Sequence, residues 1–354
     1  MNRPIEGDPV RTVQYQRDRE FALVEAPPRS PGPGLVQIEV AYVGLCGTDL
    51  HIYHGAMDGR VADDAVIGHE MSGTIAAIGT GVEGWTVGDA VTVMPLDWDG
   101  TCSACLAGHE HICQNLNFIG IDSPGALQQR WIVPARTLVR LPPGMRLDHA
   151  ALVEPIAVSV HDVRRAGIEP GERAVVIGGG PIGVLIATTA REFGAEVLVV
   201  ELDSTRRAAV AALGFAVIDP SAEDQIARVE EWTAGAGADV VFEVSGAAAA
   251  VLGATALARV RGRIVVVAIH PEPRPIDLQR IFWRELILIG ARVYERHDFE
   301  TAVDLLARGV VPADLLITRI VPLAAVGEAF AALDEGGAMK ILVDVQAYPT
   351  ADSR

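Results

Sequence analysis

The sequence has no hydrophobic run long enough to cross a membrane. A spanning helix needs about 20 consecutive apolar residues, and no apolar run in the 354 residues approaches that length. The N-terminus, MNRPIEGDPVRTVQYQRDRE, is polar and lacks the basic and then apolar order of an export signal. We therefore expect no membrane association and a cytoplasmic location.

Basic residues are also scarce. There are 29 Lys and Arg residues against 46 Asp and Glu residues, so the formal net charge is -17. No segment gathers the basic side chains that would follow a phosphate backbone. These features argue against nucleic-acid binding.

Cysteine is the third scarce residue type. The chain has four cysteines, of which Cys102, Cys105 and Cys113 lie close together while Cys46 stands alone upstream. A disulfide scaffold needs more cysteines and more even pairing, so metal ligation or thiol reactivity is the better interpretation.

Apolar residues, by contrast, are plentiful, and they are arranged in two different patterns. Half of the chain is hydrophobic, and 354 residues exceed what one core usually holds, so we expect two domains. Up to about residue 150, alternating apolar residues with frequent Gly and Pro, as in 35–47, 72–93 and 128–144, predict a β-rich domain.

After Glu154 the pattern changes to that of an α/β domain. A helical stretch at 155–167 precedes continuous Val and Ile runs, which are typical of parallel strands buried on both faces. With helical segments between them, they predict a doubly wound domain. Further strands are expected at 216–220, 238–246, 262–270 and 286–293. The tail from about Asp298 has helix and then strand character and is expected to return to the first domain.

A glycine motif lies between the first buried strand of that domain and the helix after it. Such a turn lets the backbone approach a pyrophosphate at the helix N-terminus, and the flanking strand and helix make the signal more specific than the glycines alone. The cofactor-binding residues expected in VVIGGGPIG are Gly178, Gly180, Pro181, Ile182 and Gly183.

Glu201 follows about twenty residues later, at the end of the second apolar strand. A carboxylate there accepts hydrogen bonds from ribose hydroxyls and repels a 2′-phosphate, which favours NAD over NADP. The neighbours leave alternatives open. Asp203 could share the carboxylate role, and Arg206 or Arg207 could accommodate a 2′-phosphate.

Four residues are of the types that bind a catalytic zinc. They are Cys46, His69, Glu70 and Glu154, which offer thiolate, imidazole and carboxylate ligands. Taken singly, each has a plainer interpretation, since a lone cysteine is often a small buried residue. The sequence alone does not make them neighbours.

Longer segments around these residues resemble a known family. GLCGTDLHIYHG, GHEMSGTIAAIGTGVEGWTVGDAV, LVEPIAVSVHDV and VVIGGGPIG, in this order and separation, are similar to the zinc-containing medium-chain dehydrogenases. The resemblance covers nearly the whole chain. It is strongest to the threonine, butanediol and polyol dehydrogenase branch.

The resemblance implies a GroES-like catalytic domain formed by residues 1–155 and 296–354, and a Rossmann NAD-binding domain formed by residues 156–295. It also implies a homo-oligomer, either a tetramer or a dimer. Cys46 and His69 are then the inner zinc ligands, while Glu70 and Glu154 each either bind the zinc or lie close to it. Thr48 and His51 occupy the positions of a proton relay, with His54 as a weaker candidate.

The cluster DGTCSACLAGHEHIC resembles the structural-zinc lobe of the same family, whose usual pattern has four cysteines. Cys102, Cys105 and Cys113 match the last three positions, whereas the first is Asp99. A carboxylate can complete a zinc site, and Asp97 is near enough to be a rival. Without zinc, the lobe would hold three free thiols.

We therefore expect an NAD-dependent zinc alcohol dehydrogenase that oxidises a small secondary alcohol, such as a polyol, sugar, diol or amino alcohol. Two alternatives are a zinc-free NADPH-dependent quinone or enone reductase of the same superfamily and a noncatalytic module that keeps the fold. Cys46, His69 and Glu201 argue against the reductase. The noncatalytic module predicts loss of zinc ligands, and none of the inner set is lost. Arg296 and Lys340 are expected to serve mainly surface or helix-end electrostatics, with contact to phosphate or substrate as the other possibility.

Overall fold

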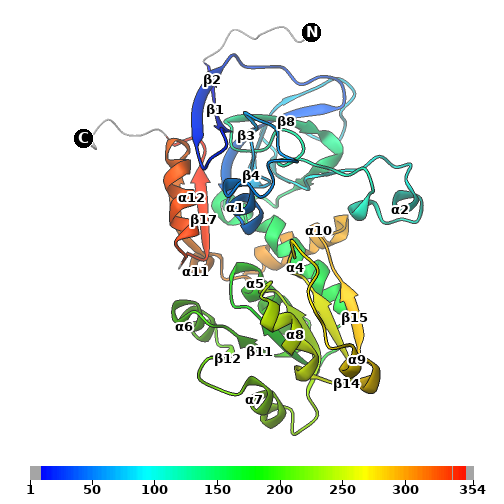
Figure 1. Ribbon diagram of the computed structural model, residues 1–354. Helices are drawn as coiled ribbons and strands as arrows, with labels where there is room; N and C mark the ends of the chain where they lie inside the picture. Colours follow the sequence, from blue (N-terminus) through cyan, green and yellow to red (C-terminus); the bar gives the residue numbers. More distant parts are fainter. Residues whose placement is uncertain (1–8, 337, 348–354) are drawn as a thin grey trace. The chain divides into compact units, whose positions relative to one another are not determined.

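The structure is a computed structural model that describes residues 9–336 and 338–347, so the first eight residues of the polar N-terminal segment lie outside it. The chain divides into two compact units (Figure 1). Unit 1 comprises Met1–Glu154 and Glu295–Arg354, and unit 2 comprises Pro155–Tyr294.

Unit 1 is built on a mixed sheet in which the described residues form seven strands. The strands follow the order β16-β17-β3-β4-β5-β9, and β8 pairs with β3 outside this path. Their bounds are β3 Leu35–Gly44, β4 Glu70–Ile78, β5 Ala90–Val93, β8 Arg130–Pro134, β9 Leu138–Arg140, β16 Ile317–Pro322 and β17 Lys340–Asp344.

The long strand β3 is the centre of this sheet. Its apolar residues Val36, Ile38 and Val40 are fully buried, which removes them from water and stabilises the sheet. β3 pairs antiparallel with β4 and with β17, so the last described strand adds to a sheet begun at residue 35.

Two two-stranded sheets and several helices complete the described part of unit 1. β1 (Val10–Tyr15) pairs with β2 (Phe21–Ala26), and β6 (Leu96–Asp97) pairs with β7 (Asn117–Phe118). The helical segments are α1 Gly47–Tyr53, α2 Ser103–Leu106, η1 Glu110–Ile112, η2 Ala135–Thr137, α3 Leu147–Ala150, α10 Arg296–Ala307, α11 Ala313–Leu316, η3 Leu323–Ala325 and α12 Val326–Asp334.

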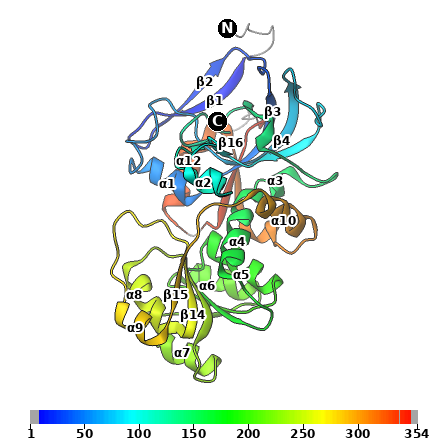
Figure 2. The ribbon, with the colours of Figure 1, turned by 90° about the vertical axis from the view of Figure 1, so that its right-hand side faces the viewer.

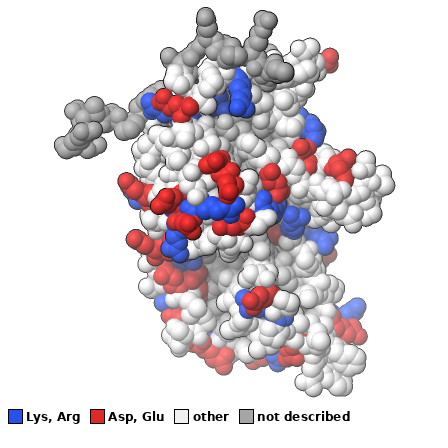
Figure 3. Space-filling model, turned by 45° about the horizontal axis from the view of Figure 1, so that its top comes forward, with Lys and Arg blue, Asp and Glu red and all other residues white. Residues whose placement is uncertain are grey.

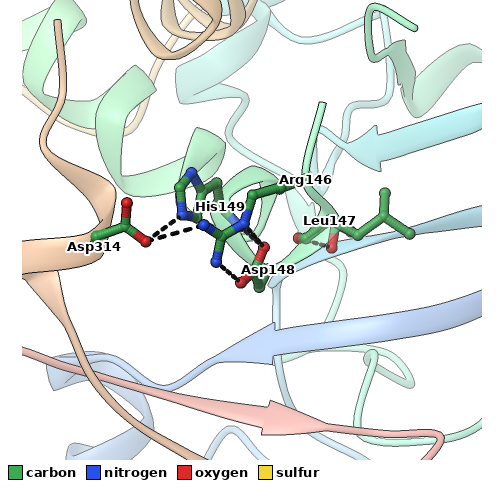
Figure 4. A network of polar contacts seen from close by, with 6 residues as sticks. Arg146, Leu147, Asp148, His149 and Asp314 are labelled. Atoms are coloured by element: carbon green, nitrogen blue, oxygen red, sulfur yellow. Dashed lines mark hydrogen bonds and ion pairs between the residues drawn. The ribbon is translucent and has the colours of Figure 1, made fainter. Parts of the chain in front are cut away.

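A polar network joins the two sequence-distant parts of unit 1 (Figure 4). Arg146 Nη1 and His149 Nε2 lie 3.1 Å and 2.9 Å from the same carboxylate oxygen of Asp314. Arg146 also pairs with Asp148. The His149 hydrogen bond lowers the pKa of Asp314. Because Asp314 is largely exposed, these pairs orient α11 beside α3 more than they stabilise the fold.

Unit 2 contains a parallel sheet in the order β12-β11-β10-β13-β14-β15 within the described residues. The bounds are β10 Arg173–Ile177, β11 Glu196–Val200, β12 Ala216–Ile218, β13 Ala238–Glu243, β14 Ala258–Val266 and β15 Ile287–Gly290. In chain order the strands run outward from β10 on one side and then from β13 on the other. This is the doubly wound arrangement, so the predicted α/β fold class is confirmed.

Helices cover both faces of this sheet, with α8 and α9 on one side and α5 and α6 on the other (Figure 2). Buried strands such as β13 therefore carry apolar residues on both faces, here Val240, Val241 and Phe242. The helices are α4 Val153–Ala166, which begins in unit 1, α5 Pro181–Glu192, α6 Ser204–Ala212, α7 Gln225–Trp232, α8 Ala248–Leu257 and α9 Leu278–Arg284.

The described residues on the face shown in Figure 3 form no dominant basic patch. On the face in Figure 3, acidic and basic side chains of the described residues alternate. In the part of the chain that the structure covers, no helix has the length and apolar character needed to cross a membrane.

We expect Gly183→Ala to destabilise the protein by more than about 2 kcal/mol, because the added Cβ would stand 1.8 Å from the carbonyl oxygen of Gly178. Gly253→Ala is the matched control in the middle of α8, where the nearest atom to an added Cβ, Gln225 Nε2, stands at an ordinary contact distance of 3.7 Å and alanine favours helix by up to about 1 kcal/mol. Thermal unfolding of both variants tests this. A Gly183→Ala protein as stable as wild type would contradict the close packing.

Candidate metal centre and cofactor site

The site in unit 1 begins where β3 ends and α1 starts. Cys46 is the N-cap residue of α1, and its backbone N–H donates to Asp49 Oδ2 at 3.0 Å. This side chain-to-backbone bond satisfies one of the otherwise unpaired groups at a helix N-terminus. It also holds the Cys46 thiol at one position beside the sheet.

The structure brings the four predicted ligands together. The Cys46 sulfur lies 3.3 Å from His69 Nε2. Ligand atoms of His69, Glu70 and Glu154 form a second group whose members all lie within 4.8 Å of one another. Of these, Glu70 begins β4 and Glu154 stands in the first turn of α4. His69, Glu70 and Glu154 are all buried.

Lys340 is buried beside Glu70. Its ammonium Nζ donates to both carboxylate oxygens of Glu70, at 2.8 and 2.7 Å, and to the carbonyl of Leu45 at 3.1 Å. The expectation that Lys340 serves surface electrostatics is therefore wrong, since its side chain is only 3% exposed. The cause is the register of β17, which carries Lys340 to the ligand cluster from a point 270 residues beyond Glu70.

Gly44 makes room for this ion pair. It lies opposite Glu70 in the β3–β4 register, and a Cβ at Gly44 would stand 2.2 Å from Glu70 Oε2. Any larger residue would displace the carboxylate.

The charges of the cluster fit a divalent metal. A thiolate at Cys46 with carboxylates at Glu70 and Glu154 carries three negative charges, which one zinc ion and Lys340 would balance. Thiolate, imidazole and carboxylate are also the ligands of catalytic zinc sites. The residues present therefore fit a zinc ion.

The electrostatics of the cluster agree with metal uptake. Burial raises the pKa of the Cys46 thiol, Asp49 adds to the shift, and His69 opposes it. Burial by itself would lower the pKa of Lys340, but Glu70, Cys46 and Glu154 together outweigh this effect and the pKa is raised. Lys340 is thus a permanent cation, while Cys46 must release a proton when it binds a metal.

Thr48 and His51 lie one turn apart on α1, so they share one face of that helix. Thr48 is half-buried and His51 is exposed. His54, the weaker candidate, is the C-cap residue of α1 and pairs instead with Asp334 at 2.7 Å.

The three cysteine sulfurs of the predicted structural-zinc lobe also lie close together. The Cys102 sulfur lies 3.5 Å from the Cys105 sulfur and 3.8 Å from the Cys113 sulfur. Thiolates that share a tetrahedral zinc at about 2.3 Å stand about 3.8 Å apart. Backbone N–H groups of Gln114 and Asn115 donate to these sulfurs, as suits charged thiolates.

Asp99 is the carboxylate that lies beside the three sulfurs. Its ligand atom belongs to the same group within 4.8 Å. Asn115 and the backbone N–H of Cys102 donate to Asp99 and hold its pKa well below the ordinary value. The rival Asp97 instead pairs with Arg136 and accepts from Asn117.

The glycine motif of unit 2 turns the chain from β10 into α5. Gly178 has a φ of 111°, a conformation that favours glycine. Gly180 is the N-cap residue of α5 and Pro181 follows in the first turn with Ile182. Gly183 packs against the carbonyl of Gly178. The free N–H groups of this helix N-terminus suit a pyrophosphate.

Glu201 closes the same turn from the neighbouring strand. Its two carboxylate oxygens accept the backbone N–H of Gly179 at 2.6 Å and of Asp203 at 2.8 Å. Asp203 caps α6 by accepting from the backbone N–H of Arg206. One oxygen of Asp203 is therefore engaged by the helix.

The two arginines differ in their surroundings. Arg207 pairs with Asp219 at 2.7 Å and donates to the carbonyl of Glu201. Arg206 Nη1 lies 3.7 Å from where a Cβ of Gly180 would stand, so its guanidinium reaches the glycine turn. Of the two, Arg206 is the one placed toward a cofactor phosphate.

Asp49, Lys340 and Gly44 were not assigned to the metal cluster from the sequence. For Asp49 a signal exists, because it stands three residues after Cys46, the spacing of a helix-capping pair. For the other two, only the strand register shows that they face Glu70.

Comparison with known proteins agrees with this architecture. Residues 32–143 match the family model described as alcohol dehydrogenase GroES-like domain, and residues 181–308 match the model described as zinc-binding dehydrogenase. The 2-dehydro-3-deoxy-L-galactonate 5-dehydrogenase of Pseudoalteromonas atlantica is 52% identical over 95% of this chain and 98% of its own length. The sorbitol dehydrogenase of Halalkalibacterium halodurans is 34% identical over 91% of this chain and 95% of its own length.

A solved structure of a zinc-binding dehydrogenase from Sinorhizobium meliloti, bound to NADP, has a TM-score of 0.89. It is 30% identical and covers 96% of this chain and all of that one. Fold and relatives together define a two-part, nicotinamide-dependent oxidoreductase. The chain belongs to the zinc-dependent medium-chain alcohol dehydrogenase family. These matches argue against the noncatalytic alternative.

We expect Asp99→Ala to lower the zinc content from about two ions per chain to about one, because three thiolates leave the tetrahedral site incomplete. Asp99→Cys should keep both ions, and Asp97→Ala is the matched control that should also keep both. Elemental analysis after dialysis measures the content. Retention of both ions by Asp99→Ala would show that another group closes the lobe.

Proposed function

We propose that this protein oxidises a secondary hydroxyl of a sugar acid or a related polyol to the ketone and transfers the hydride to NAD. The observation that carries the proposal is the buried cluster of Cys46, His69, Glu70 and Glu154, with its charge balanced by Lys340. The sugar-acid class is supported by the relative named 2-dehydro-3-deoxy-L-galactonate 5-dehydrogenase, which matches 95% of the chain at 52% identity.

In this mechanism Cys46, His69, Glu70 and Glu154 would hold a zinc ion beside the reacting hydroxyl of the substrate. Zinc held there would act as a Lewis acid that lowers the pKa of the alcohol. Thr48 accepts the hydroxyl proton and passes it by hydrogen bonding toward His51, whose exposed imidazole returns it to solvent. A bound nicotinamide would accept the carbinol hydrogen as hydride, so that one alcohol and NAD would give one ketone, NADH and a proton.

Asp49 and Lys340 are positioning residues in this scheme. Asp49 Oδ1 lies 3.7 Å from His69 Nδ1, on the side of the ring opposite Cys46, where a carboxylate favours the orientation in which Nε2 faces a metal. Lys340 holds both oxygens of Glu70. Neither needs to touch the substrate.

The test of the proposed function is NADH formation over a substrate panel of 2-dehydro-3-deoxy-L-galactonate, L-galactonate, sorbitol, 2,3-butanediol and L-threonine. We expect the sugar acids to be turned over best. Cys46→Ser should lower kcat by more than about 100-fold because the metal ligand is lost, while NADH binding, measured by fluorescence, stays near wild type. Full turnover by Cys46→Ser would contradict the zinc mechanism.

We also propose a preference for NAD over NADP. Glu201 lies 8% exposed at the end of β11, where its charge would repel a 2′-phosphate. Arg206 is the one neighbour placed to offset this repulsion.

Glu201→Ser should therefore lower kcat/KM for NAD and raise the ratio of NADP to NAD use by about tenfold or more, because the repulsive charge is removed. Glu196→Ser, at the exposed start of the same strand, is the matched control and should leave the ratio unchanged. Steady-state kinetics with both cofactors measures the effect. An unchanged ratio in Glu201→Ser would mean that the ribose is recognised elsewhere.

We propose further that two copies associate through unit 2. β15 is an edge strand whose Ile287 and Leu288 are about half exposed, and α9 beside it exposes Phe282 and Trp283. An open apolar strand edge is a template for pairing with a second strand. A second copy, related by a two-fold axis, offers the same edge. The arrangement supports a dimer, from which a tetramer would need a further contact.

Leu288→Arg should shift the protein toward the monomer, because a charge on the paired edge opposes association. Leu23→Arg, at a similarly exposed strand position in unit 1, is the control and should leave the assembly intact. Light scattering coupled to size-exclusion chromatography measures the mass. A Leu288→Arg protein with the wild-type mass would show that the interface lies elsewhere.

A further inference from the structure

Glu243 is a buried carboxylate that the proposed hydride transfer does not use. It ends β13 and is 1% exposed. Its Oε1 accepts three hydrogen bonds, from the backbone N–H of Ser245 at 3.1 Å, from the Ser245 hydroxyl at 2.8 Å and from the backbone N–H of Gly246 at 2.9 Å. One oxygen thus closes the turn that leaves the strand.

The other oxygen holds a histidine. Glu243 Oε2 lies 3.1 Å from Nε2 of His270, which stands in the loop after β14. Because a carboxylate oxygen only accepts, Nε2 carries the hydrogen, and in the neutral ring Nδ1 is then an acceptor. Nδ1 is itself buried and has no hydrogen-bond partner among the described residues. A buried acceptor without a partner costs free energy, so it points to a ligand.

This pair stands at the switch point of the unit 2 sheet. Strand order reverses between β10 and β13, where Ile177 lies opposite Glu243. In doubly wound sheets, a dinucleotide binds across the crevice at that point. A Cβ on Gly178 would stand 3.2 Å from the backbone nitrogen of Ser245, so the turn held by Glu243 borders the glycine turn.

The two halves of the sheet suit different halves of the dinucleotide cofactor. Each half of such a sheet binds one mononucleotide. β10 to β12 carry the glycine turn and Glu201, which suit the adenosine half and the pyrophosphate. β13 to β15 and the loop with His270 therefore face the nicotinamide half.

We propose that His270 binds the nicotinamide nucleotide, with Nδ1 accepting a hydrogen bond from a ribose hydroxyl or from the carboxamide N–H. Glu243 is its positioning residue, since it fixes the ring and leaves Nδ1 as acceptor. The inference rests on the proposed cofactor. It adds a side-chain contact to a cofactor half that the glycine motif and Glu201 do not reach.

The test compares ligands that do and do not contain the nicotinamide half. In His270→Gln, the amide can keep the contact to Glu243 at the Nε2 position but offers nothing at Nδ1. We expect its Kd for NADH to rise about tenfold and its Kd for AMP to stay unchanged. His270→Asn, whose amide oxygen can stand near Nδ1, should weaken NADH binding less. His297→Gln, a half-exposed histidine on α10, is the control.

Fluorescence titration with NADH and calorimetric titration with AMP give both constants. An unchanged Kd for NADH in His270→Gln would overturn the inference, as would an equal loss of AMP affinity, which would indicate damage to the whole unit. His270→Asn supplies the same NADH-to-AMP comparison if His270→Gln fails to fold. Absence of NADH binding by the wild-type protein would overturn the proposed function itself, whereas loss confined to the His270 variants concerns only the inference.

Discussion

The buried ion pair between Glu70 and Lys340 is the interaction on which the candidate metal centre depends. It links β4 to β17, two strands that flank β3 on opposite sides. Removing one partner of a buried pair typically costs about 3 to 5 kcal/mol, because the remaining charge is left without compensation. Gly44 on the intervening strand has no side chain, and this absence is what allows the pair to form across it.

In unit 2 the corresponding constraint is a set of hydrogen bonds between carboxylates at the ends of strands and the backbone of the neighbouring turns. Glu201 after β11 and Glu243 at the end of β13 each accept backbone N–H groups from the turn beside them. Both lie at the carboxyl ends of their strands, beside the start of the glycine turn. Bonds of this kind to a charged acceptor are stronger than neutral ones, so the turns are held before any cofactor arrives.

Much of this organisation could be predicted from the sequence. The switch from alternating to continuous apolar runs separates a β-rich part from a doubly wound part, and the fold class is confirmed. The glycine motif and Glu201 were predicted from their spacing after buried strands. The ligand residues were chosen by chemical type and by resemblance, since residues as distant as Cys46 and Glu154 have no local pattern that joins them.

What the sequence by itself determined is therefore the local chemistry: which strands are buried, where the helix N-terminus offers N–H groups, and which side chains can bind a metal. Only the tertiary structure decided that Lys340 is a buried partner of Glu70, that Asp99 rather than Asp97 lies beside the three sulfurs, and that Glu243 contacts His270. The physical reason is strand register. Period-two alternation states which residues share a face, but pairing between distant strands decides which of them meet.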